Sequence, residues 1–223
     1  MEKVKRYYIE EERYDWVEVA ERFRGIESLF LRNRRRLISK ALRKFSRGSP
    51  TLDAGCGTGL ILMRLPEAVG VDINPWAVGK ALTRCTQRQH LIVGDLEYLP
   101  LRNRVFRTVV CTEVIEHLPN PLRALEEIWR VMRPNGVMVG SVPHRSILRR
   151  LYEKLKFRGL LGKALSTLTS CPRGEPFHHH YTMDEVGRML GKFFKMVSLW
   201  IPFLRLNVMF VCEKASTKPS PYS

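Results

Sequence analysis

Five short runs of apolar, mostly β-branched residues recur through the middle of the chain, each ended by a Gly, Asp or Thr. Two more follow near the C-terminus, joined by a short turn around 202–205. Runs of this length are typical of strands, and runs without alternation suit a parallel sheet that is buried on both faces. The predicted strands are PTLDAG (50–55), AVGVDI (68–73), HLIVGD (90–95), RTVVCTEV (107–114), GVMVGSV (136–142), KMVSLWIP (195–202) and RLNVMFVCEK (205–214).

The segments between the strands carry signals for the start of helices. An Asn-Pro pair, which provides a capping side chain and a first-turn proline, stands before residues 76–87 and again before residues 122–133. Thr182 and Glu185 have the spacing of a capping box and begin a further predicted helix. Two stretches, 21–45 and 144–168, mix arginine with Leu, Ile and Phe at helical spacing, which predicts amphipathic helices.

Alternating strands and helices followed by a strand pair predict an α/β protein with a doubly wound sheet. We expect a seven-stranded Rossmann-like sheet, mostly parallel with an antiparallel final strand, and helices on both faces. A single domain is expected over residues 1–214. Its predicted parts are a basic helical cap (1–48), a core (50–142), a basic insertion or lid (144–181) and the last helix with the strand pair (182–214), and a disordered tail (215–223) follows.

Composition points to a cytoplasmic protein. No apolar run approaches the roughly 18 residues that a membrane-spanning helix needs, and the N-terminus lacks the apolar stretch of a secretory signal. The cysteines are odd in number and lie far apart, without the pairing of a zinc site, which favours a reducing compartment. They are Cys56, Cys85, Cys111, Cys171 and Cys212.

Positive charge is concentrated in two stretches. The chain has 38 Lys and Arg against 22 Asp and Glu. Residues 21–50 hold ten basic and two acidic side chains, and residues 144–174 hold eight basic and one acidic. A basic field attracts nucleic acid, an anionic membrane or an acidic ligand, although a simple solvated surface explains each stretch equally well.

The stretch LDAGCGTG (52–59) places Gly55, Gly57 and Gly59 directly after the first predicted strand. In a doubly wound sheet, ligands bind beyond the carboxyl ends of the strands, and a glycine turn there lets a ligand lie against the bare backbone. The spacing Gly-x-Gly-x-Gly differs from the Gly-x-Gly-x-x-Gly of dinucleotide sites. The turn alone is therefore weak evidence for a dinucleotide.

Carboxylates stand at the ends of three successive predicted strands, and no lysine or arginine lies among them. Asp53 precedes the glycine turn, Asp72 ends the second strand and Asp95 ends the third. A carboxylate at the position of Asp72 can accept both hydroxyls of a ribose. Asp53 would repel a pyrophosphate but can receive a positively charged amino-acid end. The set fits a cationic nucleoside ligand.

Several segments together resemble the successive motifs of class I S-adenosylmethionine-dependent methyltransferases, in their order and spacing. They are LDAGCGTG, VGVDINP, GDLEYLPL, FRTVVCTEVIEHLPNP and IWRVMRPNGVMVGSVPH. The chain is most similar to the type 11 branch, which includes methyltransferases of ubiquinone and menaquinone biosynthesis. The resemblance makes 50–142 the cofactor-binding core. Asn135 replaces a common glycine of the family, and the crossover LILMRLPEA is unusually short.

The resemblance implies which residues hold S-adenosylmethionine. Asp53 and the backbone from Gly55 to Gly57 would hold the methionine portion, Asp72 the ribose hydroxyls, and Asp95 with Leu96 the adenine. Cys111 and the residues just after it would line the methionine side. The full implied set is Asp53, Ala54, Gly55, Cys56, Gly57, Asp72, Ile73, Asp95, Leu96 and Cys111.

Transfer of a methyl group from a sulfonium needs a base only when the acceptor must lose a proton. His117, just past the fourth predicted strand, is the candidate base, and a packing role at the rim is the alternative. Glu113, Glu116 and His117 also have the spacing of one face of a helical turn, and a similar pattern binds a divalent ion in small-RNA 2′-O-methyltransferases. We assign no metal, but the question stays open at this point.

The acceptor is predicted to be small or lipid-like. The aromatic residues in the basic stretches are interleaved with aliphatic ones, as in anchors for a membrane surface, and no nucleic-acid module is visible. Peripheral contact with an anionic membrane fits this prediction. The alternatives are an RNA-directed methyltransferase, a binding module without turnover and, more distantly, a nicotinamide oxidoreductase.

Overall fold

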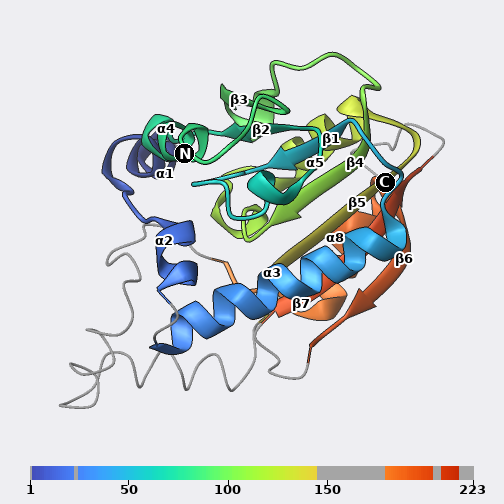
Figure 1. Cartoon of the computed structure of the whole chain (residues 1–223). Coiled ribbons are helices and arrows are strands. Elements are labelled where there is room, and N and C mark those ends of the chain that lie inside the picture. Colours follow the sequence, from blue (N-terminus) through green and yellow to red (C-terminus); the bar gives the residue numbers. More distant parts are fainter. Residues whose placement is uncertain (1, 23–24, 145–178, 203–206, 216–223) are drawn as a thin grey trace.

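The computed structural model describes residues 2–22, 25–144, 179–202 and 207–215. Its centre is a seven-stranded sheet (Figure 1) in the order β3-β2-β1-β4-β5-β7-β6. The strands are β1 (Thr51–Ala54), β2 (Ala68–Asp72), β3 (Gln89–Val93), β4 (Phe106–Thr112), β5 (Met132–Pro143), β6 (Phe194–Trp200) and β7 (Asn207–Lys214). All seven coincide with predicted strands, apart from shifts at their ends.

The sheet is parallel from β3 to β5, and β7 runs antiparallel to both of its neighbours, β5 and β6. The order reverses between β1 and β4, because the chain first builds outward from β1 to β3 and then returns to the other side of β1. The predicted doubly wound fold with an antiparallel final strand is confirmed. Ligand sites of such sheets lie at this reversal point.

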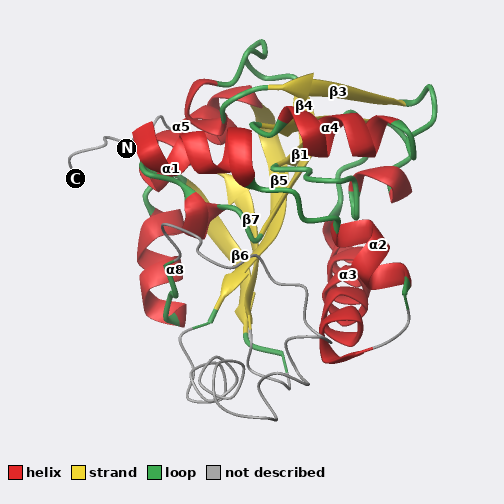
Figure 2. Cartoon of the chain, turned by 90° about the vertical axis from the view of Figure 1, so that its left-hand side faces the viewer, coloured by secondary structure: helices red, strands yellow, loops and turns green. Residues whose placement is uncertain are grey.

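Apolar side chains of the central strands point alternately to the two faces of the sheet, and each face has its own core. In β5, Met138 and Val142 pack on one face, while Val137 and Val139 pack on the other. Helices α5 (Pro121–Val131) and α8 (Met183–Gly191) cover the first face, and α3 (Gly25–Phe45) covers the second. Figure 2 shows the sheet between these two layers, with α2 (Trp16–Glu21) beside α3 and α4 (Pro75–Leu82) nearer to β2 and β3.

The helix starts follow the predicted caps. The side chain of Asn74 accepts hydrogen bonds from two amides at the start of α4, and that of Asn120 accepts one at the start of α5. Thr182 and Glu185 form the predicted capping box of α8. Asn135 has a φ of 60°, which is the left-handed conformation that asparagine tolerates and that the turn requires.

One prediction about a helix needs correction, and the crossover after β1 is as short as the sequence indicated. Helix α4 ends at Leu82 instead of residue 87, because the amides of Arg84 and Cys85 both donate to the Ala81 carbonyl and tighten the last turn. Between β1 and β2 there is only the short helical turn η2 (Leu62–Arg64). Helix α3, from the N-terminal part, covers this face instead, since Ile38 packs in one core with Leu62.

The predicted lid (144–181) lies almost entirely outside the described residues, which leave out 145–178. Most of the predicted turn (202–205) and of the predicted tail (215–223) also lies outside them. Within the part of the chain that the structure describes, no helix is long and apolar enough to cross a membrane.

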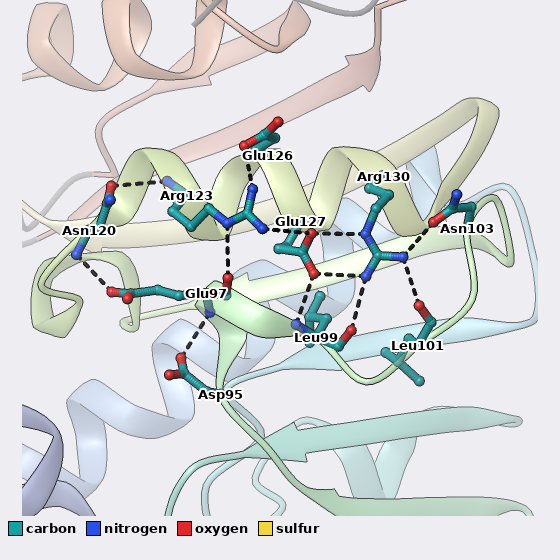
Figure 3. A network of polar contacts seen from close by, with 10 residues as sticks. All are labelled: Asp95, Glu97, Leu99, Leu101, Asn103, Asn120, Arg123, Glu126, Glu127 and Arg130. Carbon is teal, nitrogen blue, oxygen red and sulfur yellow. Dashed lines mark hydrogen bonds and ion pairs between the residues drawn. The ribbon is translucent and has the colours of Figure 1, made fainter.

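A polar network ties α5 to the segment that follows β3 (Figure 3). The guanidinium of Arg130 donates to the carbonyl oxygens of Leu99 and Leu101 at 2.9 and 2.8 Å, and it pairs with the Glu127 carboxylate at 2.7 Å. Glu127 also accepts the Leu99 amide at 2.9 Å. Burial by itself would raise the pKa of Glu127, but the hydrogen bonds and charge of Arg130 hold it below its usual range. The network fixes the loop that begins at Asp95.

Arg130→Ala should lower the free energy of unfolding by about 2–3 kcal/mol, because the nearly buried Glu127 carboxylate loses its cation and two carbonyl groups lose a donor. Urea denaturation measures this change. Arg102→Ala, at an exposed arginine of the same loop, is the control and should change stability by less than about 0.5 kcal/mol. Equal effects of the two substitutions would contradict the structural role of the network.

Candidate functional site

A cavity lies beyond the carboxyl ends of β1, β2, β3 and β4. Residues at and just after the ends of these strands line it, together with residues of the N-terminal segment and α3. The N-terminal segment comprises α1 (Glu2–Arg6), η1, a π-helical turn (Tyr7–Glu11), and the stretch up to α2. The cavity therefore lies at the reversal point of the sheet.

The glycine turn after β1 forms part of the cavity wall. Gly55 has a φ of 78° and Gly57 a φ of 50°, a region that side chains disfavour. A Cβ atom on Gly55 would lie 2.3 Å from a methyl carbon of Val114, so the turn also excludes a side chain by close packing. Bare backbone thus faces the cavity, as the sequence predicted.

Asp53 is buried, with 2% of its surface exposed, and it lines the cavity. One of its carboxylate oxygens, Oδ2, has no hydrogen-bond partner among the described residues. Burial, together with the nearby charge of Asp72, raises the pKa of Asp53 to about 7. A buried carboxylate with a free oxygen is suited to receive a cation or a hydrogen-bond donor from a ligand.

Asp72 also lines the cavity, and its carboxylate is held by backbone amides. Oδ2 accepts from Gly57 at 2.7 Å, and Oδ1 accepts from Asn74 at 2.9 Å. Burial raises the pKa of Asp72, and these backbone hydrogen bonds oppose that rise. Each oxygen of a carboxylate can accept a further hydrogen bond, so Asp72 keeps capacity for ligand hydroxyls.

Asp95 caps the short helical turn η3 (Leu96–Tyr98) through its Oδ1, which accepts the Glu97 amide at 2.9 Å. Its Oδ2 pairs with the ammonium of Lys5 at 2.6 Å, and Lys5 also pairs with Glu97 at 2.7 Å. The sequence showed no basic residue among the three acids. The fold supplies one from the N-terminal segment.

The N-terminal segment contributes residues that the sequence analysis missed. Lys5, Tyr8, Glu12 and Trp16 all line the cavity. The main-chain carbonyl of Glu12 accepts from the side-chain amide of Asn74 at 2.8 Å, which joins this segment to the loop after β2. No sequence signal marks these contacts, because the partners lie 60 or more positions away along the chain.

Arg34 of α3 is a second missed residue of the cavity wall. It is 7% exposed, and its Nε has no hydrogen-bond partner among the described residues. One of its guanidinium nitrogens lies 3.5 Å from the Glu113 carboxylate, and the group stacks near the rings of Trp16 and Phe30. The basic charge of the stretch 21–50 was visible in the sequence, but the position of Arg34 in the cavity wall was not.

His117 lines the cavity at the end of η4 (Ile115–His117), a helical turn after β4. Its Nδ1 is hydrogen-bonded to the hydroxyl of Tyr8 at 2.7 Å, and its Nε2 lies 3.8 Å from the carboxylate of the fully buried Glu116. His117 is thus part of the cavity wall, and the hydrogen bond with Tyr8 orients its ring.

The expectation that Glu113, Glu116 and His117 share one face of a helical turn is wrong. Glu113 has a φ of 54° and precedes the turn, and its Oε1 accepts from Ser141 at 2.8 Å and Asn207 at 2.7 Å. The carboxylate is therefore directed at β5 and β7. Among the described residues, no group of three His, Cys, Asp or Glu side chains could hold a metal ion.

Of the other residues expected to hold the cofactor, some line the cavity and some lie in the hydrophobic core. Cys56, Ile73 and Leu96 line the cavity together with the acids and glycines. Ala54 and Cys111 are fully buried in the core under α5 and do not line it. Cys111 nevertheless precedes Thr112, Glu113 and Val114, which do. Burial raises the pKa of the Cys111 thiol, so it stays protonated.

A doubly wound sheet with acidic residues at three strand ends beside a glycine turn is an architecture suited to binding a nucleoside. Residues 52–140 match the family described as "Methyltransferase domain", in its type 11 form. The match covers well under half of the chain and assigns this segment, by similarity, to the class I S-adenosylmethionine-dependent methyltransferases.

Individual similar proteins agree with this assignment. The chain is 32% identical over 123 residues to a demethylmenaquinone methyltransferase of Staphylococcus haemolyticus, covering 50% of this chain and 51% of that protein. It is 29% identical over 113 residues to a ubiquinone biosynthesis O-methyltransferase of Coxiella burnetii, covering 48% of each. The chain thus matches about half the length of these curated relatives. The PH0226 protein of Pyrococcus horikoshii shares the fold, with a TM-score of 0.68, 19% identity, and coverage of 94% and 96% of the two chains.

Asp53→Asn should stabilise the protein at alkaline pH. Because folding raises the pKa of Asp53 from 3.8 to about 7, the folded state holds a proton there that the unfolded chain has lost. The stability that this proton provides is complete below the ordinary pKa and is lost as the pH rises through about 7. The asparagine variant has no such loss and should be more stable by about 4 kcal/mol at pH 8.

Urea denaturation measures the free energy of unfolding of both proteins at pH 4 and pH 8. The advantage of the variant over the wild-type protein should be larger at pH 8. Glu67→Gln, at an exposed carboxylate, is the matched control and should show no such trend. An Asp53→Asn variant no more stable than the wild-type protein at pH 8 would contradict the buried charge.

Proposed function

We propose that this chain is an S-adenosylmethionine-dependent methyltransferase that acts on a small or lipid-like acceptor. The observation that carries the proposal is the buried carboxylate of Asp53, which lines the cavity beside the glycine turn and has one oxygen, Oδ2, without a hydrogen-bond donor among the described residues. The ammonium group of S-adenosylmethionine is the donor that such an oxygen requires, and the family assignment supports it.

The other residues of the cavity fit the remaining parts of the cofactor. Arg34 supplies a cation for the methionine carboxylate, so that Asp53 and Arg34 together hold the zwitterionic end. Asp72 accepts the ribose hydroxyls, and the adenine lies toward Asp95 and Leu96. This division places opposite charges where the ligand carries them, which gives specificity as well as affinity.

The protein's part in the reaction is alignment and removal of water. When bound, the cofactor supplies the electrophilic methyl group, and transfer is a displacement that depends on the acceptor being held in line. Side chains of the N-terminal segment line the cavity and limit water there. His117 lies where a proton of the acceptor can be taken up.

A small or lipid-like acceptor is supported by the two quinone-pathway relatives, whose names describe such substrates. The described structure offers no specific observation that favours RNA. The contact of the basic helix with an anionic membrane stays a prediction.

Asp72→Ala should weaken the binding of S-adenosylmethionine by about 1–3 kcal/mol, because the ribose hydroxyls lose their acceptor in a buried site. Titration calorimetry measures the affinity. Asp184→Ala, at an exposed carboxylate on α8, is the control and should leave it unchanged. Unchanged affinity in both variants would remove Asp72 from the cofactor site.

Arg34→Gln should weaken S-adenosylmethionine about tenfold while leaving decarboxylated S-adenosylmethionine unaffected, because only the former carries the carboxylate that Arg34 pairs with. The comparison separates a ligand contact from general damage, since a misfolded cavity would weaken both ligands. Equal losses for the two ligands would assign Arg34 a structural role.

A further inference from the structure

The N-terminal segment is fixed across the cavity at two points. Near its start, Lys5 pairs with Asp95 at 2.6 Å and with Glu97 at 2.7 Å, beyond the end of β3. Near its end, the carbonyl and carboxylate of Glu12 accept from the Asn74 side chain at 2.8 and 3.2 Å, beyond the end of β2. The π-helical turn η1 lies between these two contacts.

Tyr8 lies on this turn, and its hydroxyl is directed at the end of β4. It is hydrogen-bonded to Nδ1 of His117 at 2.7 Å, and the two rings meet edge to face with centroids 5.2 Å apart. Both side chains line the cavity. Since Lys5 and Glu12 hold the backbone on either side of it, the position of Tyr8 over His117 is fixed by several independent contacts.

The carboxylate of Glu116 completes a row of groups. It is fully buried and lies 3.8 Å from Nε2 of His117. A carboxylate on this side favours the tautomer with the proton on Nε2, which leaves Nδ1 as an acceptor for the Tyr8 hydroxyl. Glu116, His117 and Tyr8 then stand in the order of a proton relay that ends at the cavity.

We propose that Tyr8 is a catalytic residue, which takes the proton of a phenolic or enolic hydroxyl acceptor and passes its own proton to His117. This inference rests on the proposed methyltransferase function. It extends that function by assigning the base to a residue 109 positions before His117 and by naming the class of acceptor.

The step balances without any further reactant. The acceptor oxygen bonds to the methyl carbon as the carbon–sulfur bond breaks, and the electron pair of that bond returns to sulfur. The acceptor's proton moves to the Tyr8 oxygen while the Tyr8 proton moves to Nδ1 of His117. The resulting imidazolium faces the Glu116 carboxylate, which stabilises its charge.

The chemistry of the relay selects the acceptor. A tyrosine hydroxyl matches a phenol or an enol in acidity, and a proton passes readily between matched groups. An aliphatic hydroxyl is a far weaker acid and fits this relay poorly. An amine that attacks as the neutral base needs no such relay before methyl transfer.

Tyr8→Phe tests the relay with two probe acceptors, catechol and 4-nitrocatechol, whose nitro group makes the hydroxyl far more acidic. The variant should turn over catechol about 100-fold more slowly, the usual contribution of a general base, with unchanged affinity for S-adenosylmethionine. The loss should largely vanish for 4-nitrocatechol, which is already ionised. Tyr7→Phe, at the neighbouring tyrosine, is the matched control and should behave like the wild-type protein.

A second measurement needs no turnover. The ¹⁵N resonances of the His117 ring report its tautomer, and loss of the Tyr8 hydroxyl should shift the Nδ1 signal in the ligand-free protein. An unchanged signal in Tyr8→Phe would overturn the hydrogen bond on which the relay depends.

The turnover outcomes separate the inference from the function. Equal losses with both probes, or no loss with either, overturn a proton-transfer role for Tyr8. A wild-type protein that binds S-adenosylmethionine but methylates neither probe overturns the acceptor class and leaves the proposed function standing. Failure to bind S-adenosylmethionine at all overturns both.

Discussion

Two neighbouring carboxylates at the ends of β1 and β2, the buried Asp53 and the half-buried Asp72, are the constraint on which the site depends. Burial and the charge of Asp72 raise the pKa of Asp53 to about 7, while Asp72 itself is held by the amides of Gly57 and Asn74. Such an arrangement opposes folding when both groups are ionised, and uncompensated groups of this kind concentrate at functional sites. A cationic ligand would relieve the repulsion between the two carboxylates. The free energy that this repulsion costs the empty protein would then be recovered on binding.

The positive charge at the cavity comes from outside the sheet. Lys5 reaches Asp95 from the N-terminal segment, and Arg34 reaches the cavity from α3. The same helix covers the sheet face over the short crossover after β1, with Ile38 in the core beside Leu62. One N-terminal region therefore completes the hydrophobic core, the charge pattern and the wall of the cavity. Folding of the core and assembly of the site are coupled through α3.

The sequence predicted correctly those features that depend on residues close together in the chain. The strands followed from their apolar runs, and the starts of α4, α5 and α8 followed from Asn74, Asn120 and the Thr182–Glu185 capping box. The presence of Asp53, Asp72 and Asp95 in one cavity followed too, because parallel strands end at the same edge of a sheet. The end of α4 did not follow, since its last turn is set by weak local hydrogen bonds without a strong stop signal.

The sequence by itself determined the fold class, the glycine turn and the acidic strand ends, because each depends on residues that are neighbours in the chain or on a rule of sheet topology. Only the tertiary structure decided which side chains meet across the cavity. Glu113 turns toward Ser141 and Asn207, and Tyr8 meets His117, through contacts between residues 28 to 109 positions apart. A side chain's direction is set by the partner that satisfies its hydrogen bonds or charge, and packing, not local pattern, brings such distant partners together.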